Sequence, residues 1–234
     1  MIWGIRSYTR FFYPSIDDPS MPTFDQQTAH EQNRHMESYY QWQSRIYDAT
    51  RWSFLFGRQG ILRAIPYDRD QPWRIAEIGC GTGFNLIRLA RRFPQAQLTG
   101  MDVSPDMIRL SQKCTRSVAN RVTLLQQPYQ KGQKTFEQPL DAIVFSYSLT
   151  MINPQWSSLL EQARADLRPG GIIAVADFHD SRFSWFKKHM SNHHVRMDGH
   201  LLPKLETLFR VRSAQVKPAY GGVWHYLMFI GERT

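Results

Sequence analysis

The sequence predicts an α/β protein built on a mainly parallel β-sheet, and three observations support this class. Short apolar runs alternate with helical segments from about residue 73 onward, the pattern of strands joined by crossover helices. Residues 141–146 are a nearly continuous apolar run, as expected of a buried parallel strand. The last two strands, at about 209–216 and 224–231, are joined by a short loop and must be antiparallel, because no crossover helix fits between them.

A strand, a turn with three glycines and a helix form the first unit of this pattern. Residues 74–78 are apolar and precede the turn, and a helix at about 85–92 follows it. The glycines, at alternate positions, are Gly79, Gly81 and Gly83. Glycine has no Cβ, so backbone N–H groups can approach a ligand closely, and the helix directs its N-terminal partial positive charge toward the same point. We therefore expect the turn to hold a nucleotide-like cofactor.

The spacing of the glycines excludes two common nucleotide-binding motifs. A dinucleotide fingerprint needs G-x-G-x-x-G, but its third glycine would fall on Phe84, and Gly83 comes one residue early. A phosphate-binding P-loop would end in Lys-Ser or Lys-Thr, which this turn lacks. The pattern that remains is Glu-x-Gly-x-Gly-x-Gly, beginning at Glu77.

An acidic residue, Asp102, ends the second strand of the predicted sheet. It lies about 20 residues beyond the glycine turn, the offset at which doubly wound folds place an acid on a ribose diol. The alternative is that Asp102 only caps the next turn. The succession of glycine turn, helix, strand and acid favours the ribose ligand.

The remaining elements continue the alternation of helices and strands. Ser104 is the expected N-cap of a helix that begins at Pro105, and residues 168–171 (Arg-Pro-Gly-Gly) end a later helix. In order, the elements after the second strand are a helix over about 105–118, a strand over 121–125, the buried strand over 141–146, a helix over 156–167 and a strand over 172–177.

The N-terminal part differs in composition from the rest of the chain. We interpret residues 1 to about 25, with three prolines between aromatic and acidic residues, as an irregular arm. Residues 26–43 are polar and compatible with a helix, and residues 46–62 carry aromatic side chains and arginines. The length suits one α/β domain with an extension. We predict a dependent arm and helical lid at 1–72 and a cofactor-binding domain at 73–234.

Composition limits the compartment and the partners. The two cysteines, Cys80 and Cys114, provide neither a disulfide framework nor a metal cluster. No apolar run approaches the roughly 18 residues that span a bilayer, and no signal-peptide core is present. We expect a cytosolic protein without a metal site. The formal net charge of +9 leaves nucleic acid, an anionic membrane and simple solubility open.

The glycine turn resembles motif I of the class I methyltransferases that use S-adenosylmethionine (SAM), and the Leu-Arg-Pro-Gly-Gly sequence at 167–171 resembles a second feature of that family. The resemblance covers about residues 73–231. It implies a Rossmann-like, mainly parallel sheet of seven strands and SAM as the cofactor. By this resemblance the cofactor-binding residues are Glu77, Gly79, Cys80, Gly81, Gly83, Asp102, Val103, Met107, Gln127 and Ser146.

One position departs from the family pattern. An acidic residue often follows the third strand and contacts the adenine amine, but here Gln126 and Gln127 follow it. The amide oxygen of Gln127 can accept the same hydrogen bond. After the fourth strand, residues 146–149 lack the Asn/Asp-Pro-Pro-aromatic sequence of methyltransferases that act on base amines, and no Pro-Cys pair serves pyrimidine C5 chemistry. Both absences argue against nucleic acid as the acceptor.

Segments outside the common core resemble betaine-lipid N-methyltransferases. They are residues 47–58, with the characteristic Tyr-Asp-x-Thr-Arg-Trp, residues 189–195 with 200–203, and residues 220–226. The similarity covers most of residues 45–231. It implies that the acceptor is the amine of diacylglyceryl homoserine, methylated three times to give the trimethylated betaine lipid.

The chemistry of this acceptor suggests roles for several side chains. Arg51 or Arg58 would bind its carboxylate in a bidentate manner, although Arg51 can instead pair with Asp48. Three aromatic faces are candidates for stabilising the quaternary cation by cation–π contact, and three side chains are candidates for taking a proton from the amine. The aromatic candidates are Tyr47, Trp52 and Tyr147, and the proton acceptors are Tyr47, Tyr147 and His179.

A lipid acceptor also implies contact with a membrane. The basic surface would hold the protein against anionic lipids, with the N-terminal arm and the aromatic and basic residues 183–188 at the interface. Two alternatives stay open. One is a small-molecule or quinone-type SAM methyltransferase whose N-terminal segment is only a lid. The other is a non-catalytic scaffold with the SAM fold that binds nucleic acid through its charge.

Overall fold

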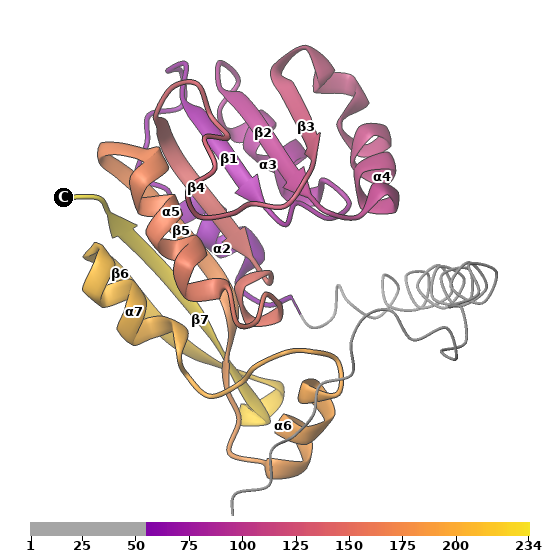
Figure 1. The fold of residues 1–234 in the computed structure, drawn as a ribbon, viewed down its shortest axis with the longest axis vertical. Coiled ribbons are helices and arrows are strands. Elements are labelled where there is room, and N and C mark those ends of the chain that lie inside the picture. Colours follow the sequence, from indigo (N-terminus) through magenta and orange to yellow (C-terminus); the bar gives the residue numbers. More distant parts are fainter. Residues whose placement is uncertain (1–54) are drawn as a thin grey trace, which may run out of the picture. The chain divides into compact units, whose positions relative to one another are not determined.

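The computed structural model describes residues 55–234, within a compact unit that spans Ser53–Thr234 (Figure 1). The predictions for the N-terminal arm, for the helix-compatible segment and for Tyr47, Arg51 and Trp52 lie outside the described residues. Helix α2 (Arg58–Ala64), which the sequence places in the lid, belongs to the same compact unit as the sheet, where Ile61 and Leu62 are buried in the core.

A seven-stranded sheet in the order β3-β2-β1-β4-β5-β7-β6 forms the centre of the molecule (Figure 1). Pairs among the first five strands are parallel, and β7 pairs antiparallel with both β5 and β6. The predicted fold class is confirmed. The strands are β1 (Arg74–Ile78), β2 (Gln97–Asp102), β3 (Val122–Gln126), β4 (Leu140–Ser146), β5 (Leu167–Asp180), β6 (Arg210–Ala219) and β7 (Trp224–Glu232).

Helices cover both faces of the sheet because the central strands alternate apolar side chains between two hydrophobic clusters. One face, called here the α2 face, packs against buried residues of α2, α3 (Phe84–Arg92), α4 (Pro105–Thr115) and α6 (Ser184–Ser191). The opposite α5 face packs against α5 (Trp156–Asp166) and α7 (Leu201–Leu208). Short 3₁₀ turns are η1 (Arg116–Arg121), η2 (Leu149–Met151) and η3 (Tyr220–Gly222).

Strand β5 is longer than the sequence suggests at both of its ends. The Pro-Gly-Gly sequence, expected to be a turn, belongs to the strand: Gly170 donates to the carbonyl of Arg233, and Arg233 donates to that of Gly171. A register shift against β4 accommodates these residues. At its other end β5 includes His179, which was expected to follow the strand. Pairing with a distant part of the chain therefore overrides the local turn signal.

The order of the strands places the candidate site. Strand β1 lies between β2 and β4, so the chain crosses to one side after β1 and returns to the other side for β4. In open α/β sheets, ligands bind beyond the carboxyl ends of the strands at such a switch point. The glycine turn after β1, Asp102 at the end of β2 and the residues after β4 all lie at this edge.

Candidate active site

The glycine turn is held tightly against its neighbours. Gly79 and Gly83 have φ angles of 73° and 78°, which side chains rarely tolerate. A Cβ on Gly79 would lie 2.7 Å from the Cβ of Ser148, after β4, and a Cβ on Gly83 would lie 2.5 Å from Oγ of Ser111, on α4. Packing within the protein therefore requires glycine at both positions.

The backbone amides of the turn already have partners within the protein. The N–H groups of Gly79 and Cys80 donate to the carbonyl of Met101, at 2.8 and 2.9 Å. The N–H of Gly81 donates to Oδ2 of Asp102 at 2.9 Å. The sequence suggested that these N–H groups approach the ligand. In the structure these three N–H groups are instead bonded within the protein.

Asp102 is fixed in place by two backbone donors. In addition to the Gly81 bond, Oδ1 accepts the N–H of Ser104 at 3.0 Å. A carboxylate has about four lone-pair positions, so each oxygen can accept a further hydrogen bond. The helix cap is supplied by Ser104, as predicted, whose Oγ accepts the N–H of Met107 at 3.3 Å. Asp102 thus retains acceptor capacity at the edge of the sheet.

The other predicted cofactor residues at this edge come from β2, α4 and β3. Val103 directly follows Asp102 and is 66% exposed, which is unusual for an apolar side chain beside a core strand. Met107 is half-buried in the first turn of α4. Gln127, also half-buried, follows the β3 residue that pairs in register with Asp102. These three residues lie at or just beyond neighbouring strand ends.

Two of the predicted cofactor residues are buried beneath the turn. Glu77 is fully buried on β1, and its Oε1 accepts a hydrogen bond from Nδ2 of Asn85, on α3, at 2.6 Å. Cys80 is also buried, and burial is the main reason that the pKa of its thiol is raised. Its Sγ lies 3.1 Å from the position that a Cβ on Gly100 would occupy, so it packs against β2. We expect both side chains to act by shaping the turn.

The residues after β4 close the other side of the edge. Ser146 is buried, and its Oγ has no hydrogen-bond partner among residues 55–234. Tyr147 has a φ of 57°, in the left-handed region, and its hydroxyl donates to the carbonyl of Phe56 at 2.7 Å. Backbone strain of this kind in a residue other than glycine is concentrated at functional sites. Burial raises the pKa of the Tyr147 phenol well above its usual value.

A buried carboxylate that the sequence did not assign to the site, Asp177 on β5, holds this segment in place. Its two oxygens accept the N–H groups of Leu149, Thr150 and Phe178 and the hydroxyl of Thr150. Burial raises its pKa to about 6 despite these donors. Asp177 therefore fixes η2, and with it the segment that packs against Gly79. The feature of the sequence that could have identified Asp177 is an acidic residue at the end of an apolar strand.

Arg58 lies beside the first residue of α3. Its guanidinium carbon is 4.2 Å from the ring centroid of Phe84, and the guanidinium of Arg88 lies 3.5 Å from the same centroid. The positive charge of Arg58 partly opposes the burial that raises the pKa of Tyr147. The guanidinium therefore lies beside Phe84, directly after the glycine turn, and the carbonyl of Phe56, two residues before Arg58, accepts the hydroxyl of Tyr147. The guanidinium of Arg58 stacks on the ring of Phe84. In the sequence, Phe84 was noted only because it stands where a dinucleotide fingerprint has its third glycine.

His179 and Tyr147 are not brought together. Asp177 and His179 share one face of β5, because side chains alternate along a strand. The ring of His179 lies beside Gly199, just before α7, on the α5 face. Phe178 points to the α2 face, where its ring centroid is 4.7 Å from that of Tyr147. Burial lowers the pKa of His179, so the imidazole is neutral at pH 7, but it lies on the opposite face from Arg58.

Comparison with known proteins identifies the central part of the chain. Residues 75–171 match the family model described as a methyltransferase domain. This part of the chain is therefore similar to methyltransferase domains. Its sheet has the Rossmann-like arrangement of the class I, SAM-dependent enzymes. The match favours an enzyme over a non-catalytic scaffold.

Curated relatives that match this part of the chain are named as methyltransferases of trans-aconitate and of malonyl-[acyl-carrier protein]. A trans-aconitate 2-methyltransferase from Rhodopseudomonas palustris (strain BisB18) is 47% identical over 116 residues, which cover 49% of this chain and 41% of the relative. A malonyl-[acyl-carrier protein] O-methyltransferase from Dechloromonas aromatica (strain RCB) is 30% identical over 123 residues, covering 49% and 42%. The matched segments thus span less than half the length of these relatives.

Solved structures share the fold of the domain at low sequence identity. The N-methyltransferase NodS from Bradyrhizobium japonicum WM9 has a TM-score of 0.60 at 17% identity, covering 75% of this chain and 93% of that chain. The 1,6-didemethyltoxoflavin-N1-methyltransferase from Burkholderia thailandensis, with bound substrate and S-adenosylhomocysteine, has a TM-score of 0.63 at 16% identity, covering 95% and 98%.

The side chains at this edge of the sheet suit SAM as the cofactor. The carboxylate of Asp102 suits a ribose diol, exposed Val103 offers an apolar contact, and the unpartnered hydroxyl of Ser146 lies at the end of β4. Within residues 55–234, no three His, Cys, Asp or Glu side chains form a group that could hold a metal ion. None of the helices in this range is long and apolar enough to cross a membrane.

Proposed function

We propose that the chain is a SAM-dependent N-methyltransferase that acts on the amine of a lipid head group carrying a carboxylate, with diacylglyceryl homoserine as the acceptor. The observation that carries the proposal is the stacking of Arg58 on Phe84, the residue that directly follows the glycine turn. The lipid is favoured by the sequence resemblance of residues 47–58, 189–195 and 220–226 to betaine-lipid N-methyltransferases.

Arg58 is suited to binding the acceptor carboxylate. A guanidinium offers paired donors that match the two oxygens of a carboxylate, and it retains this capacity while its face stacks on an aromatic ring. Stacking on Phe84 directs the plane of the guanidinium and limits its freedom before the acceptor arrives. An acceptor anchored in this way holds its amine beside the cofactor turn, which lowers the entropic cost of reaching the in-line arrangement.

The cofactor side needs little acid–base chemistry. When bound, SAM supplies an electrophilic methyl group on a positively charged sulfur. Asp102 would accept hydrogen bonds from its ribose hydroxyls, Val103 and Met107 would contact its adenine, and Gln127 would accept from the adenine amine. Gly79, Gly81, Gly83 and Ser146 would line its amino-acid side, with Glu77 and Cys80 supporting the turn from below.

An amine acceptor must present a free lone pair, and the described side chains do not include an obvious base for it. Tyr147 stays protonated at neutral pH because its pKa is raised, and its hydroxyl donates to the carbonyl of Phe56. His179 can accept a proton but lies on the other face of the sheet. We therefore propose that the neutral fraction of the amine reacts, so that kcat/KM rises with pH up to the pKa of the acceptor amine.

Methylation of a carboxylate is the second candidate. It is favoured by the 47% identity to a trans-aconitate 2-methyltransferase over half of this chain. Arg58 would then hold one carboxylate of the acceptor while another reacts. A carboxylate is ionised well below pH 7, so kcat/KM would be independent of pH from about pH 6 upward. The slope of the pH profile thus separates the two candidates.

The test of the anchoring role compares the two arginines that stack on Phe84. Arg58→Ala should raise KM for a carboxylate-bearing acceptor by about tenfold to a hundredfold, the value of a lost charge-assisted hydrogen bond or pair. KM for SAM should change by less than about threefold, because Arg58 is not assigned to the cofactor. Arg88→Ala, which removes the other cation from the same ring, is the matched control and should leave the acceptor KM unchanged.

Two outcomes would contradict the anchor. One is an equal rise in KM for SAM and acceptor in Arg58→Ala, which indicates a structural role. The other is an effect of Arg88→Ala as large as that of Arg58→Ala, which indicates that only the stacking matters. Arg58→Lys separates charge from geometry, since lysine keeps the charge but loses the paired donors.

A further inference from the structure

We infer that the surface around helix α6 docks on an anionic lipid bilayer. The inference deepens the proposed function, on which the identity of the acceptor lipid rests, but it is argued from the surface itself.

Helix α6 has two different sides. Phe186 is 6% exposed and belongs to the core of the α2 face, whereas Trp185, the residue before it, is 65% exposed. The exposed indole of Trp185 packs beside the rings of Phe183 and Phe186, with ring centroids 6.1 and 5.6 Å from its own.

The segment around α6 is strongly basic. Residues 181–197 contain four Lys or Arg, three His and no Asp or Glu. Two of the four cations are paired with flanking acids: Lys187 with Asp180 at 2.5 Å, and Arg196 with Asp198 at 2.7 Å. The other two, Arg182 and Lys188, are exposed and form no ion pair within residues 55–234. The surface therefore presents positive charge for an anionic partner.

Exposed aromatic rings gather at the same end of the molecule. Among the large hydrophobic residues exposed in the described part of the chain, the aromatic ones are Phe56, Trp185 and Tyr220. Phe56 and Tyr220 meet edge to face, with ring centroids 5.2 Å apart. The η3 turn that carries Tyr220 is joined to the segment before α6, because the hydroxyl of Ser181 donates to the carbonyl of Val223 at 2.6 Å.

We call this set of residues the α6 surface: Phe56, Arg182, Trp185, Lys188 and Tyr220. Tryptophan and tyrosine are enriched at membrane–water interfaces because an apolar ring with a polar edge suits the head-group region. Cations beside them add attraction to anionic lipids. An acidic protein would also pair with the cations, and its binding is one outcome of the test below. The combination therefore favours a bilayer.

The α6 surface adjoins the candidate acceptor site. Phe56 contributes its ring to the surface, while its carbonyl accepts the hydroxyl of Tyr147, at the end of β4. Arg58 follows two residues later. Docking through this surface would bring the acceptor site to the level of the lipid head groups. An acceptor lipid would then reach Arg58 without leaving the bilayer.

The test uses flotation of the full chain with vesicles, without any methyl transfer. Vesicles of phosphatidylcholine and phosphatidylglycerol in equal parts should bind the protein, and vesicles of phosphatidylcholine alone should bind it weakly. Reversing both unpaired cations, Arg182→Glu with Lys188→Glu, should lower the partition coefficient by at least about twentyfold, from about 1 kcal/mol for each basic residue at the surface.

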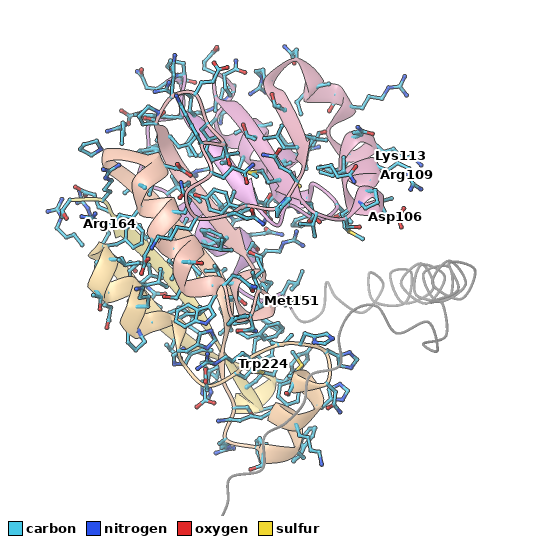
Figure 2. All side chains as sticks on the ribbon, in the orientation of Figure 1. Asp106, Arg109, Lys113, Met151, Arg164 and Trp224 are labelled. Atoms are coloured by element: carbon cyan, nitrogen blue, oxygen red, sulfur yellow. The ribbon has the colours of Figure 1, made fainter. Side chains whose placement is uncertain are left out.

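The matched control makes the same change of charge at the end of α4 and the start of η1, away from α6 (Figure 2). Lys113 and Arg116 are exposed, and Figure 2 labels Lys113 on α4, away from the α6 surface. Lys113→Glu with Arg116→Glu should lower the partition coefficient by less than about threefold, because salt screens distant charges. Trp185→Ala should weaken binding by a factor that salt does not change. Thermal unfolding followed by circular dichroism verifies that each variant is folded.

Equal vesicle binding by the two double variants would overturn the inference, as would equal binding of wild type to neutral and anionic vesicles. A wild-type chain that ignores vesicles but binds an acidic carrier protein through Arg182 and Lys188 would also overturn it. The proposed function fails separately: a chain that docks through α6 but methylates no lipid refutes the acceptor and keeps the surface.

Discussion

Replacement of Asp102 tests the assignment of the cofactor site most sharply. In Asp102→Asn the side chain keeps its shape, but one oxygen becomes an NH₂ group facing the N–H of either Gly81 or Ser104, which now donate at 2.9 and 3.0 Å. The bonds proposed to the ribose hydroxyls also lose their charge. Each hydrogen bond to a charged group contributes about 1.5–3 kcal/mol. Because the amide oxygen of asparagine keeps part of these bonds, we expect the binding of SAM to weaken by about 2–4 kcal/mol, which raises Kd by about thirtyfold to several hundredfold.

Calorimetric titration with SAM measures this change directly. Asp106→Asn is the control, because Asp106 lies four residues away on α4, pairs with Arg109 and is assigned no contact with the cofactor (Figure 2). Its Kd for SAM should stay within about twofold of wild type, as for independent sites. A change of less than about threefold in Asp102→Asn would refute the ribose assignment, provided that its circular dichroism spectrum is that of wild type.

Two further predictions concern carboxyl and phenol groups whose pKa values are raised. The pKa of Asp177 is raised from 3.8 to about 6, so the folded state binds its proton more tightly, and this group costs stability progressively as pH rises from about 4 to about 6. Relative to Asp177→Asn, wild type should therefore lose roughly 3 kcal/mol of unfolding free energy between about pH 4 and about pH 6, as measured by urea unfolding. The same difference in unfolding free energy between the two proteins at both pH values would contradict this. Tyr147 donates a hydrogen bond and has a raised pKa, so we do not expect it to act as the base. Tyr147→Phe should therefore lower kcat by less than about tenfold, measured in stopped-time assays, without shifting the pH profile. A larger loss of kcat would assign proton transfer to Tyr147.

The parts of the account that were predictable from the sequence depend on local signals. The three glycines at alternate positions predict the turn, because positive φ angles and close packing require residues without a Cβ. The offset of Asp102 beyond the glycine turn predicts an acidic residue at the end of the second strand. The preference of helix caps for serine predicts that Ser104 caps the following helix. The antiparallel final pair follows from a loop too short for a crossover.

The features that the sequence did not predict arise from contacts between distant segments. Strand β5 runs through a Pro-Gly-Gly sequence because Arg233 supplies hydrogen bonds from the end of the chain. Helices α6 and α7 have eight residues each, which is too short for a clear periodic signal. The separation of His179 from Tyr147 depends on which face each residue takes, and the role of Asp177 depends on η2 folding against it.

The acceptor side shows the same limit. Arg58 was one of two arginine candidates for the carboxylate, and only its stacking on Phe84 places it beside the glycine turn. Arg51, Trp52 and Tyr47 lie outside the described residues, so their proposed contacts with the acceptor stay predictions.

The most direct test of the proposed function follows the methyl group itself. The full chain is incubated with methyl-labelled SAM and vesicles that contain diacylglyceryl homoserine, with trans-aconitate offered in a parallel reaction. The account predicts label in the lipid fraction as mono-, di- and trimethylated head groups, at a rate that rises with pH. Label that enters only trans-aconitate or other water-soluble acids, at a rate independent of pH, would contradict it.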